Sequence, residues 1–323
     1  MLSVHFLEDL EASYLEHLTP RLDGRVSLTH GERLPDNPDY DILIAGRFRE
    51  EHLTASPNLR SVIIPWAGLP VSARELLLHY PQITVHNMHY NAVMVAETAA
   101  ALMLAAARRT VPVDQALRRG DWTVRYARHK SIRLCGKTAL ILGYGAIGRR
   151  IAGICEGLGM RVRATRRTPK EERDGAVEIY FTTWLHRLLP EADVLLIATP
   201  LTPETKNMIG AYELSLLPDR ATVVNIARGH IIEERALWEE LRSERIQAGL
   251  DVWYNYPRTP EARPYTLPSN FPMHTLDNVV MSPHMAEHSV DTEIRHAEEL
   301  ANMLNAAASG NPLSNSVDPV RGY

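Results

Sequence analysis

The sequence predicts an α/β protein with two doubly wound domains, each built on a parallel β-sheet. Three observations support this fold class. The chain has 323 residues, and because domains of about 100–200 residues are usual we expect two of them. Short apolar runs alternate with longer helical patterns through most of the chain, which is typical of parallel strands covered by helices on both faces. A glycine-rich turn directly follows one of the apolar runs.

Three short apolar runs in the first part of the chain are predicted to form buried strands. They are 41–45 (DILIA), 61–64 (SVII) and 83–85 (ITV), and the stretches between them are long enough for helices. Residues 91–109 follow, are rich in Ala, Leu and Met, and contain no internal Gly or Pro. Because this composition favours a helix, we expect one long helix there.

The same alternation continues in the second part of the chain and predicts six further strands. These are 138–142 (TALIL), 161–165, 194–198 (VLLIA), 221–226 (ATVVNI), 248–252 and 279–282. Five prolines lie between residues 254 and 278. Since proline is excluded from helix interiors and central strands, we expect a long loop there, and loops of such length in compact domains are usually functional.

The connector 118–133 is strongly basic. It contains six Lys or Arg residues against one acid, Asp121. We expect a solvated surface loop, and a site for a polyanion is the alternative.

The overall composition is that of an ordinary globular protein. Apolar residues make up 45%, charged residues 23%, and the net charge is −4, so nothing favours a nucleic acid or an anionic membrane as partner. Two cysteines, Cys135 and Cys155, are too few for a disulfide framework. The N-terminal segment lacks a basic signal-peptide region. The longest apolar stretch, 92–107, contains Glu97 and is shorter than the roughly 20 residues that span a bilayer. We therefore expect a soluble cytoplasmic protein.

The glycine-rich turn has the GxGxxG pattern of a dinucleotide-binding site, between a predicted strand and a helical stretch. It consists of Gly143, Tyr144, Gly145, Ala146, Ile147 and Gly148. In this pattern the first glycine permits the tight turn, the second lets the backbone approach the pyrophosphate, and the third allows close helix–strand packing. The helix N-terminus then offers free N–H groups to the phosphates. A purely structural glycine turn is the alternative.

The end of the next strand predicts which dinucleotide binds. An NAD site needs an acid about 20 residues after the turn to hold the ribose 2′-OH, whereas arginine accommodates the 2′-phosphate of NADP. Here the strand at 161–165 is followed by Arg166, Arg167 and Thr168, with no acid before Glu171. We therefore favour NADP(H), with NAD(H) as the alternative if the arginines are only solvated.

Five segments resemble the D-isomer-specific 2-hydroxyacid dehydrogenase family, and the likeness extends over nearly the whole chain. They are LCGKTALILGYGAIGRRIA (134–152), EADVLLIATPLTPETKNMIG (191–210), VVNIARGHIIEERAL (223–237), AGLDVW (248–253) and NVVMSPH (278–284). The resemblance implies a Rossmann coenzyme domain, residues 92–285, inserted in a discontinuous flavodoxin-like substrate domain, residues 1–91 and 286–323. It also implies a catalytic cleft between the domains and a homodimer formed through the Ala-rich helix region.

The resemblance further implies a catalytic pair. Arg228 lies in the N-x-x-R-G segment that in this family binds the substrate carboxylate and carbonyl oxygen. A planar guanidinium suits the coplanar oxygens of a 2-oxo acid. His284 matches the general acid/base, because ketone reduction leaves an alkoxide that needs a proton from a group titrating near neutrality. Asp251 matches the position that contacts the nicotinamide carboxamide.

The remaining site residues are also implied by the resemblance. The backbone N–H groups of a loop after the strand at 61–64 would hold the substrate carboxylate, and its Trp66 either covers an apolar substrate group or belongs to the core. This loop consists of Trp66, Ala67, Gly68 and Leu69. Asn91 would face the cleft. Residues expected along the bound dinucleotide are Thr199, Pro200, Leu201, Thr205, Ile226 and Ala227.

One position departs from the family pattern. The family usually has a Glu five residues after the Asp251 position, which pairs with the catalytic His, but here Tyr256 stands there. A tyrosine hydroxyl cannot supply the charge that favours imidazolium. We therefore expect His284 to act without a carboxylate partner, held by Tyr256 or by Glu287, and reduction to decline above about pH 6.5. Formate dehydrogenases, distant relatives of this family, also lack the Glu. They have Ser and Gly two and three residues after their His, where this chain has Ala286 and Glu287, so we do not favour formate as the substrate.

Two other functional classes remain as alternatives. Residues His284–His288 spell H-x-x-E-H, an inverted zinc-peptidase motif, but that motif must lie on a helix and Pro283 favours a corner, so we expect no metal. The second alternative is a dinucleotide-sensing binding protein with little turnover. We prefer reversible hydride transfer between NADP(H) and a small 2-oxo or D-2-hydroxy acid, with glyoxylate or hydroxypyruvate as the nearest substrates.

Overall fold

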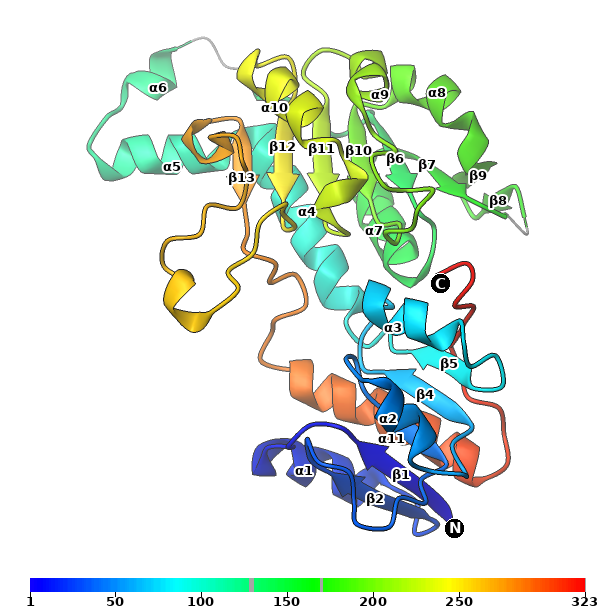
Figure 1. Ribbon diagram of the computed structural model, residues 1–323. Helices are drawn as coiled ribbons and strands as arrows, with labels where there is room; N and C mark the ends of the chain where they lie inside the picture. The colour runs from blue at the N-terminus through cyan, green and yellow to red at the C-terminus, as the bar shows by residue number, and fades with distance from the viewer. Residues whose placement is uncertain (128–130, 169–170, 323) are drawn as a thin grey trace. The chain divides into compact units, whose positions relative to one another are not determined.

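The computed structural model describes residues 1–127, 131–168 and 171–322 (Figure 1). Two basic residues of the connector, Arg128 and Lys130, lie outside these ranges. The chain divides into two compact units. The first consists of Met1–Asn91 and His288–Tyr323, and the second of Ala92–Glu287. Each unit has its own sheet.

The sheet of the first unit has the flavodoxin-like strand order. Its strands are β1 (Leu2–Phe6), β2 (Val26–His30), β3 (Ile42–Ile44), β4 (Ser61–Ile64), β5 (Thr84–Asn87) and β14 (Ser316–Val317). They lie in the order β14-β5-β4-β3-β1-β2, in which only β14 runs antiparallel to its neighbour. The order 2-1-3-4-5 of the parallel strands defines a doubly wound sheet.

Helices cover both faces of this sheet. They are α1 (Ala12–Leu18), α2 (Glu50–Thr54), α3 (Val71–Leu77) and α11 (Thr292–Ala308), with a 3-10 turn at Thr19–Arg21. One apolar cluster packs β1, β3 and β4 against α1 and α11. A second cluster packs the opposite side chains of the strands against α2 and α3. Such two-sided burial explains why β3 and β4 are mainly apolar.

The sheet of the second unit contains the Rossmann order. Its strands are β6 (Thr138–Leu142), β7 (Arg161–Arg166), β8 (Arg173–Asp174), β9 (Val177–Phe181), β10 (Val194–Ile197), β11 (Thr222–Asn225), β12 (Gln247–Leu250) and β13 (Val279–Met281). They lie in the order β13-β12-β11-β10-β6-β7-β9-β8, and only β8 is antiparallel. The segment β9-β7-β6-β10-β11-β12 corresponds to the order 3-2-1-4-5-6.

Two apolar clusters also cover the faces of the second sheet. One lies under α8 (Leu185–Leu188), α9 (Ala211–Leu216) and α10 (Glu234–Arg242). The other lies under α4 (Ala92–Arg108) and α7 (Ala146–Gly157). Two more helices, α5 (Thr110–Arg118) and α6 (Thr123–Tyr126), follow α4. The predicted α/β class with two doubly wound sheets is therefore confirmed.

All nine predicted strands and the long helix are present, with shifts of at most two residues at their ends. The sequence patterns miss five strands: β1, β2, β8, β9 and β14. Strand β1 contains His5, and β2 is an edge strand with exposed alternate residues, so neither forms a continuous apolar run. Strands β8 and β14 have two residues each, too few to carry a periodic pattern.

The two predicted loops have different outcomes. The 254–278 segment is irregular apart from 3-10 turns at Pro260–Ala262 and Met273–Thr275, as expected. The connector is not a simple loop, because helix α6 interrupts it. The reason is local: the carboxylate of Asp121 accepts the N–H (2.9 Å) and the hydroxyl (2.5 Å) of Thr123, which satisfies a free donor at the helix start.

In the part of the chain that the structure describes, no helix is long and apolar enough to cross a membrane. The two cysteines are not joined: Cys135 is exposed and Cys155 is buried.

Candidate active site

The glycine-rich turn joins β6 to α7 and leaves an open cradle at the helix N-terminus. Gly143 has φ +101°, and its N–H donates to the carbonyl of Thr165 on β7 (3.2 Å). A Cβ at Gly143 would lie 2.7 Å from the carbonyl oxygen of Ala198, and one at Gly148 would overlap the carbonyl oxygen of Gly143. Nothing lies within 4 Å of a Cβ position at Gly145. Gly143 therefore permits the turn, Gly148 permits close packing of the helix, and Gly145 leaves the backbone open to a ligand. This is the division that a dinucleotide-binding turn requires.

The other residues of the turn differ in what they can offer a dinucleotide. The Tyr144 ring is buried, and its hydroxyl donates to the Asp174 carboxylate (3.1 Å). The Arg149 guanidinium lies 5.4 Å from the centre of this ring and 3.5 Å from the same carboxylate. Burial raises the pKa of Tyr144 to about 12, and the bond to Asp174 adds to the rise. Only the backbone of Tyr144 therefore faces the cradle. Ala146 and Ile147 are half-buried.

The end of β7 presents basic groups beside the turn. Arg166 is half-buried, and Arg167 and Thr168 are exposed. Among residues 1–127, 131–168 and 171–322, none forms an ion pair with Arg166. The guanidinium is therefore available to an external anion.

The loop after β10 is braced by its own hydroxyl groups. Thr199, Pro200 and Leu201 are half-buried. The Thr205 hydroxyl donates to the carbonyl of Pro200 (2.6 Å) and accepts the N–H of Thr202 (2.7 Å). The side chain of Thr205 thus stabilises the conformation of this loop through hydrogen bonds to its backbone.

Arg228 follows β11 and is held by a residue that the sequence patterns did not single out. The buried Asn225 side chain accepts the N–H of Ala227 (3.1 Å) and donates to the carbonyl of Arg228 (2.9 Å). Ile226 is buried and Ala227 half-buried, whereas Arg228 is exposed. The N-x-x-R-G pattern contains Asn225, so its spacing could have indicated this role.

Gly229 allows the Arg228 turn to approach the next loop. A Cβ at Gly229 would lie 2.6 Å from the carbonyl carbon of Trp253, closer than real side chains come. The backbone after β11 and the backbone after β12 are therefore in direct contact. This contact brings Arg228 to the loop that carries Tyr256.

Tyr256 lies beside His284. Their ring centres are 5.6 Å apart and the planes are tilted by 55°. The Tyr256 hydroxyl accepts the backbone N–H of Trp253 (3.0 Å), so it points toward its own loop. Burial raises the pKa of Tyr256, the Trp253 hydrogen bond and the positive charge of Arg228 oppose the rise, and the negative charge of Asp251 adds to it. Tyr256 therefore lies near Arg228, Asp251 and His284.

His284 has an unusual backbone conformation. It follows β13 and Pro283 and has φ +59°, a left-handed value that is uncommon for residues other than glycine. Such conformations persist where the surroundings fix them, and they concentrate at functional sites. The His284 side chain is exposed.

Asp251 follows β12 and is fully buried. Its Oδ1 accepts the Ser282 hydroxyl (2.5 Å) and the N–H of Met285 (2.9 Å), and its Oδ2 accepts the N–H of Ala286 (3.1 Å). The structure therefore gives this carboxylate partners on both sides of His284.

The loop with the expected substrate contacts belongs to the first unit. Trp66, Ala67, Gly68 and Leu69 are half-buried after β4. The Ala67 carbonyl accepts the Asn87 amide (2.6 Å). Trp66 and Leu69 pack against the apolar cluster under α2 and α3, so the interpretation of Trp66 as part of the core is supported. Asn91 is buried at the end of this unit. Contact of these residues with a substrate held by Arg228 stays a prediction.

The H-x-x-E-H motif does not have the geometry of a zinc peptidase. Residues 284–288 form a turn, not a helix. Within the described ranges, no three His, Cys, Asp or Glu side chains are grouped so as to hold a metal ion.

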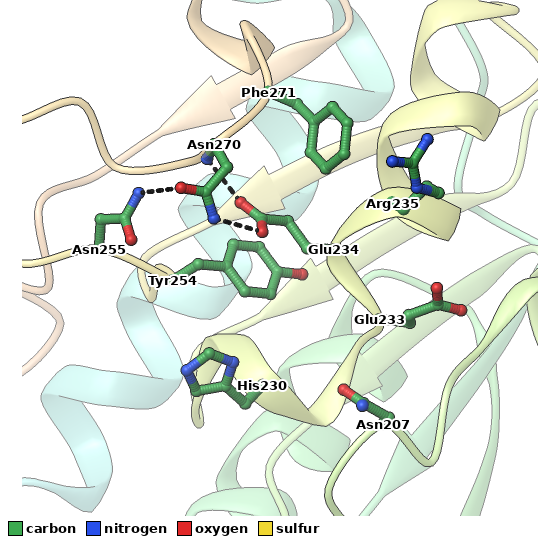
Figure 2. A pocket seen from close by; sticks show the side chains of 9 residues that line it. All are labelled: Asn207, His230, Glu233, Glu234, Arg235, Tyr254, Asn255, Asn270 and Phe271. Carbon is green, nitrogen blue, oxygen red and sulfur yellow. Dashed lines mark hydrogen bonds between the residues drawn. The ribbon is translucent and has the colours of Figure 1, made fainter.

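A pocket of about 370 Å³ lies between the start of α10 and the Pro-rich loop (Figure 2). Figure 2 shows Glu234 bonded to Asn270, whose N–H (2.7 Å) and side-chain amide (2.8 Å) both donate to the carboxylate. The same carboxylate accepts the Ser269 hydroxyl (2.8 Å). None of the predicted catalytic or cofactor-binding residues lines this pocket. Its polar contacts fasten the loop that carries Tyr256.

Comparison with known proteins gives a consistent result. The family model described as D-isomer specific 2-hydroxyacid dehydrogenase, NAD binding domain, matches residues 100–286. D-3-phosphoglycerate dehydrogenase of Archaeoglobus fulgidus is 30% identical over 92% of this chain and 55% of the relative. Glyoxylate reductase of Aeropyrum pernix is 38% identical over 69% of this chain and 65% of the relative. The match thus spans about half the length of the first relative and about two thirds of the length of the second.

Other matches extend over both chains. Glyoxylate/hydroxypyruvate reductase B of Yersinia pestis is 31% identical over 96% of this chain and 94% of the relative. A D-isomer specific 2-hydroxyacid dehydrogenase of Xanthobacter autotrophicus, solved with NADPH and MES, has a TM-score of 0.81 at 25% identity over 99% of both chains. An NADPH-dependent glyoxylate/hydroxypyruvate reductase of Sinorhizobium meliloti, solved with NADP and malonate, has a TM-score of 0.75 at 26% identity over 99% and 98%. On its glycine turn and these matches, the chain belongs to the D-isomer specific 2-hydroxyacid dehydrogenase family.

Proposed function

We propose that this protein catalyses reversible hydride transfer between NADP(H) and a small 2-oxo or D-2-hydroxy acid. The observation that carries the proposal is the grouping of Arg228, Tyr256 and His284 at the carboxyl edge of the parallel sheet that also ends in the glycine-rich cradle. In open α/β sheets this edge is where ligands bind. The family membership supports the same activity.

The chain's own residues would divide the work as follows. The exposed Arg228 guanidinium binds the substrate carboxylate and the carbonyl oxygen, and so stabilises the negative charge that grows on that oxygen during reduction. The imidazolium of His284 gives its proton to the same oxygen, and in the oxidation direction the neutral imidazole takes the hydroxyl proton. The nicotinamide, when bound, supplies or accepts the hydride.

The preference for NADP(H) rests on the end of β7. Arg166 has no ion-pair partner among the described residues, and the strand ends in Arg166, Arg167 and Thr168, where an NAD site would have an acid. A guanidinium can pair with the 2′-phosphate, which an acid would repel. The Xanthobacter and Sinorhizobium structures contain NADPH and NADP, which supports the same cofactor here.

Glyoxylate and hydroxypyruvate are the substrates we propose first, because relatives carry these names. The N–H groups of the 66–69 loop and the side chain of Asn91 would complete the substrate contacts. Thr205 and the neighbouring loop residues would lie along the dinucleotide. Because both cysteines are unpaired, we also propose a cytoplasmic location.

We further propose a homodimer through the helices after the interdomain boundary. Several large apolar side chains of α4, α5, α6 and the residue before α6 are exposed: Leu104, Val113, Leu117, Trp122 and Tyr126. Apolar patches of this kind mark protein interfaces. Light scattering should give twice the monomer mass, and Leu117→Glu should shift the protein to monomer, whereas Leu78→Glu on the other unit should not. A monomeric wild-type protein would contradict the proposal.

The experiment that tests the proposed function measures cofactor oxidation by the purified protein. NADPH and NADH are compared with a panel of 2-oxo acids, from glyoxylate and hydroxypyruvate to phenylpyruvate, at mildly acidic pH. We expect turnover with NADPH preferred, and Arg166→Gln should lower that preference by about tenfold or more, the loss of one charge-assisted pair. Arg161→Gln, at the other end of β7, is the matched control. Dinucleotide binding without turnover of any acid would instead support a sensor, which the absence of the usual Glu at Tyr256 makes worth testing.

A further inference from the structure

The segment on either side of His284 is fastened to one buried side chain. The carboxylate of Asp251 accepts the Ser282 hydroxyl, two residues before His284, and the N–H groups of Met285 and Ala286 just after it. Asp251 itself is 0% exposed. Three donors therefore converge on one carboxylate, and all three come from the segment that carries the candidate acid/base.

The backbone around Asp251 fixes both ends of this arrangement. The N–H of Asp251 donates to the carbonyl of Asn225 on β11 (3.0 Å), and the N–H of Ser282 donates to the carbonyl of Leu250 (2.8 Å). The indole N–H of Trp253 donates to the carbonyl of Ser282 (2.8 Å). Asp251 therefore follows the hydrogen-bonded end of β12. Ser282, the first residue of the segment that its carboxylate binds, is also held by backbone and indole hydrogen bonds.

The conformation of His284 needs such support. Its φ of +59° is strained for a residue with a side chain, and strained conformations persist only where neighbouring contacts fix them. Asp251 receives hydrogen bonds from the residues on both sides of this point. Without these bonds the segment could relax to an extended conformation, which would turn the imidazole away from Tyr256.

We propose that Asp251 is a positioning residue that holds His284 in its working orientation by bonding to both flanks of its turn. This inference rests on the proposed function, because it assigns His284 the proton transfer. It differs from the expected role of Asp251 as a direct contact of the nicotinamide. A side chain with no exposed surface and three donors already bound is better placed to fix its own chain than to meet a ligand.

The test uses variants of near-equal size. Asp251→Asn replaces one acceptor oxygen by an NH2 group, so at least one of the three donors loses its partner. Ser282→Ala removes only the hydroxyl bond and leaves Asp251 unchanged, whereas Ser282→Thr keeps a hydroxyl and is the conservative control. Four quantities are measured for each variant: kcat with the best 2-oxo acid, the KM of that acid, the Kd of NADPH by its fluorescence, and the Cε1–Hε1 resonance of His284, assigned with His284→Gln.

We expect the variants to lower kcat while the affinity for NADPH stays nearly the same. Because a misplacement of about 1 Å can reduce the rate about 100-fold, Asp251→Asn should lower kcat by about 30- to 100-fold, and Ser282→Ala by a smaller factor. The Kd of NADPH should stay within about threefold. The His284 resonance of the dinucleotide-free protein should shift or broaden in both variants and return to its original position in Ser282→Thr.

Two results would overturn the inference. If Asp251→Asn raises the Kd of NADPH tenfold or more while the His284 resonance stays in place, Asp251 is a direct cofactor contact. If both variants only lower the melting temperature and kcat per folded molecule is unchanged, the carboxylate is merely structural. A wild-type protein that turns over no 2-oxo acid would contradict the proposed function, and the resonance measurement would still decide whether Asp251 fixes the orientation of His284.

Discussion

Replacing Tyr256 with glutamate tests whether a carboxylate at this position sets the pH range of the reaction. The Tyr256 ring centre lies 5.6 Å from that of His284, so the carboxylate introduced by Tyr256→Glu would act on the imidazole from about this distance. Two unit charges at this separation interact by about 0.7 kcal/mol in bulk water and by about 3 kcal/mol at an effective dielectric constant near 20. Because Tyr256 is 45% exposed, the lower half of this range applies, about 0.7–1.5 kcal/mol.

The sign follows from which form of His284 is favoured. A negative charge nearby favours the imidazolium, the form that donates the proton in ketone reduction. The pH at which reduction falls to half should therefore rise, by about 0.5–1 pH unit at 1.36 kcal/mol per unit. The onset of hydroxy-acid oxidation, which needs the neutral imidazole, should rise by the same amount.

The assay is the pH dependence of kcat/KM in both directions, at two ionic strengths. Tyr256→Gln is the uncharged control for the introduced group, and Tyr256→Phe shows what loss of the Trp253 hydrogen bond does by itself. The difference between Tyr256→Glu and Tyr256→Gln should shrink at high salt, because exposed charges are screened. If the two variants have the same pH profile, the carboxylate does not act on His284 and the reasoning is wrong.

Three further predictions follow from the packing. Gly148→Ala should abolish dinucleotide binding, measured by NADPH fluorescence, because its Cβ would overlap a carbonyl oxygen of the same turn; Gly153→Ala on the same helix, with open space around it, should leave binding unchanged. Gly229→Ala should lower kcat/KM by about 100-fold by pushing the Arg228 turn away from the Trp253 backbone, without loss of NADPH affinity; unchanged activity would mean that this contact is unimportant. The third prediction concerns His296. Burial lowers the pKa of His296 to about 4, and the hydrogen bond to the Pro65 carbonyl opposes this effect. Since the unfolded chain binds this proton below about pH 6.5, the free energy of unfolding should fall as pH drops from 6.5 to 4, by up to about 3 kcal/mol. Urea unfolding of His296→Gln should show a smaller fall, and an equal fall in wild type and variant would refute the assignment.

Local patterns in the sequence predicted nine of the strands that the structure describes. The catalytic residues were indicated by the resemblance to a known family, and their roles stay predictions. Strands β6, β10 and β11 are mainly apolar and fully buried because both faces of their sheet are covered. The glycine turn is a short-range feature whose spacing reflects the geometry of one strand-to-helix junction. Edge and very short strands such as β2, β8 and β14 could not be predicted, because pairing with a neighbour, and not their own composition, makes them strands.

The details of the site depended on contacts between distant segments. The sequence indicated Arg228, Asp251, Tyr256 and His284, but Asp251 meets its partners 31 to 35 residues away. The direction of the Tyr256 hydroxyl and the burial of the Tyr144 ring are likewise results of packing. A pattern along the chain can show that a carboxylate follows a strand. Which donors it receives depends on how neighbouring strand ends lie in space, and only the tertiary structure decides that.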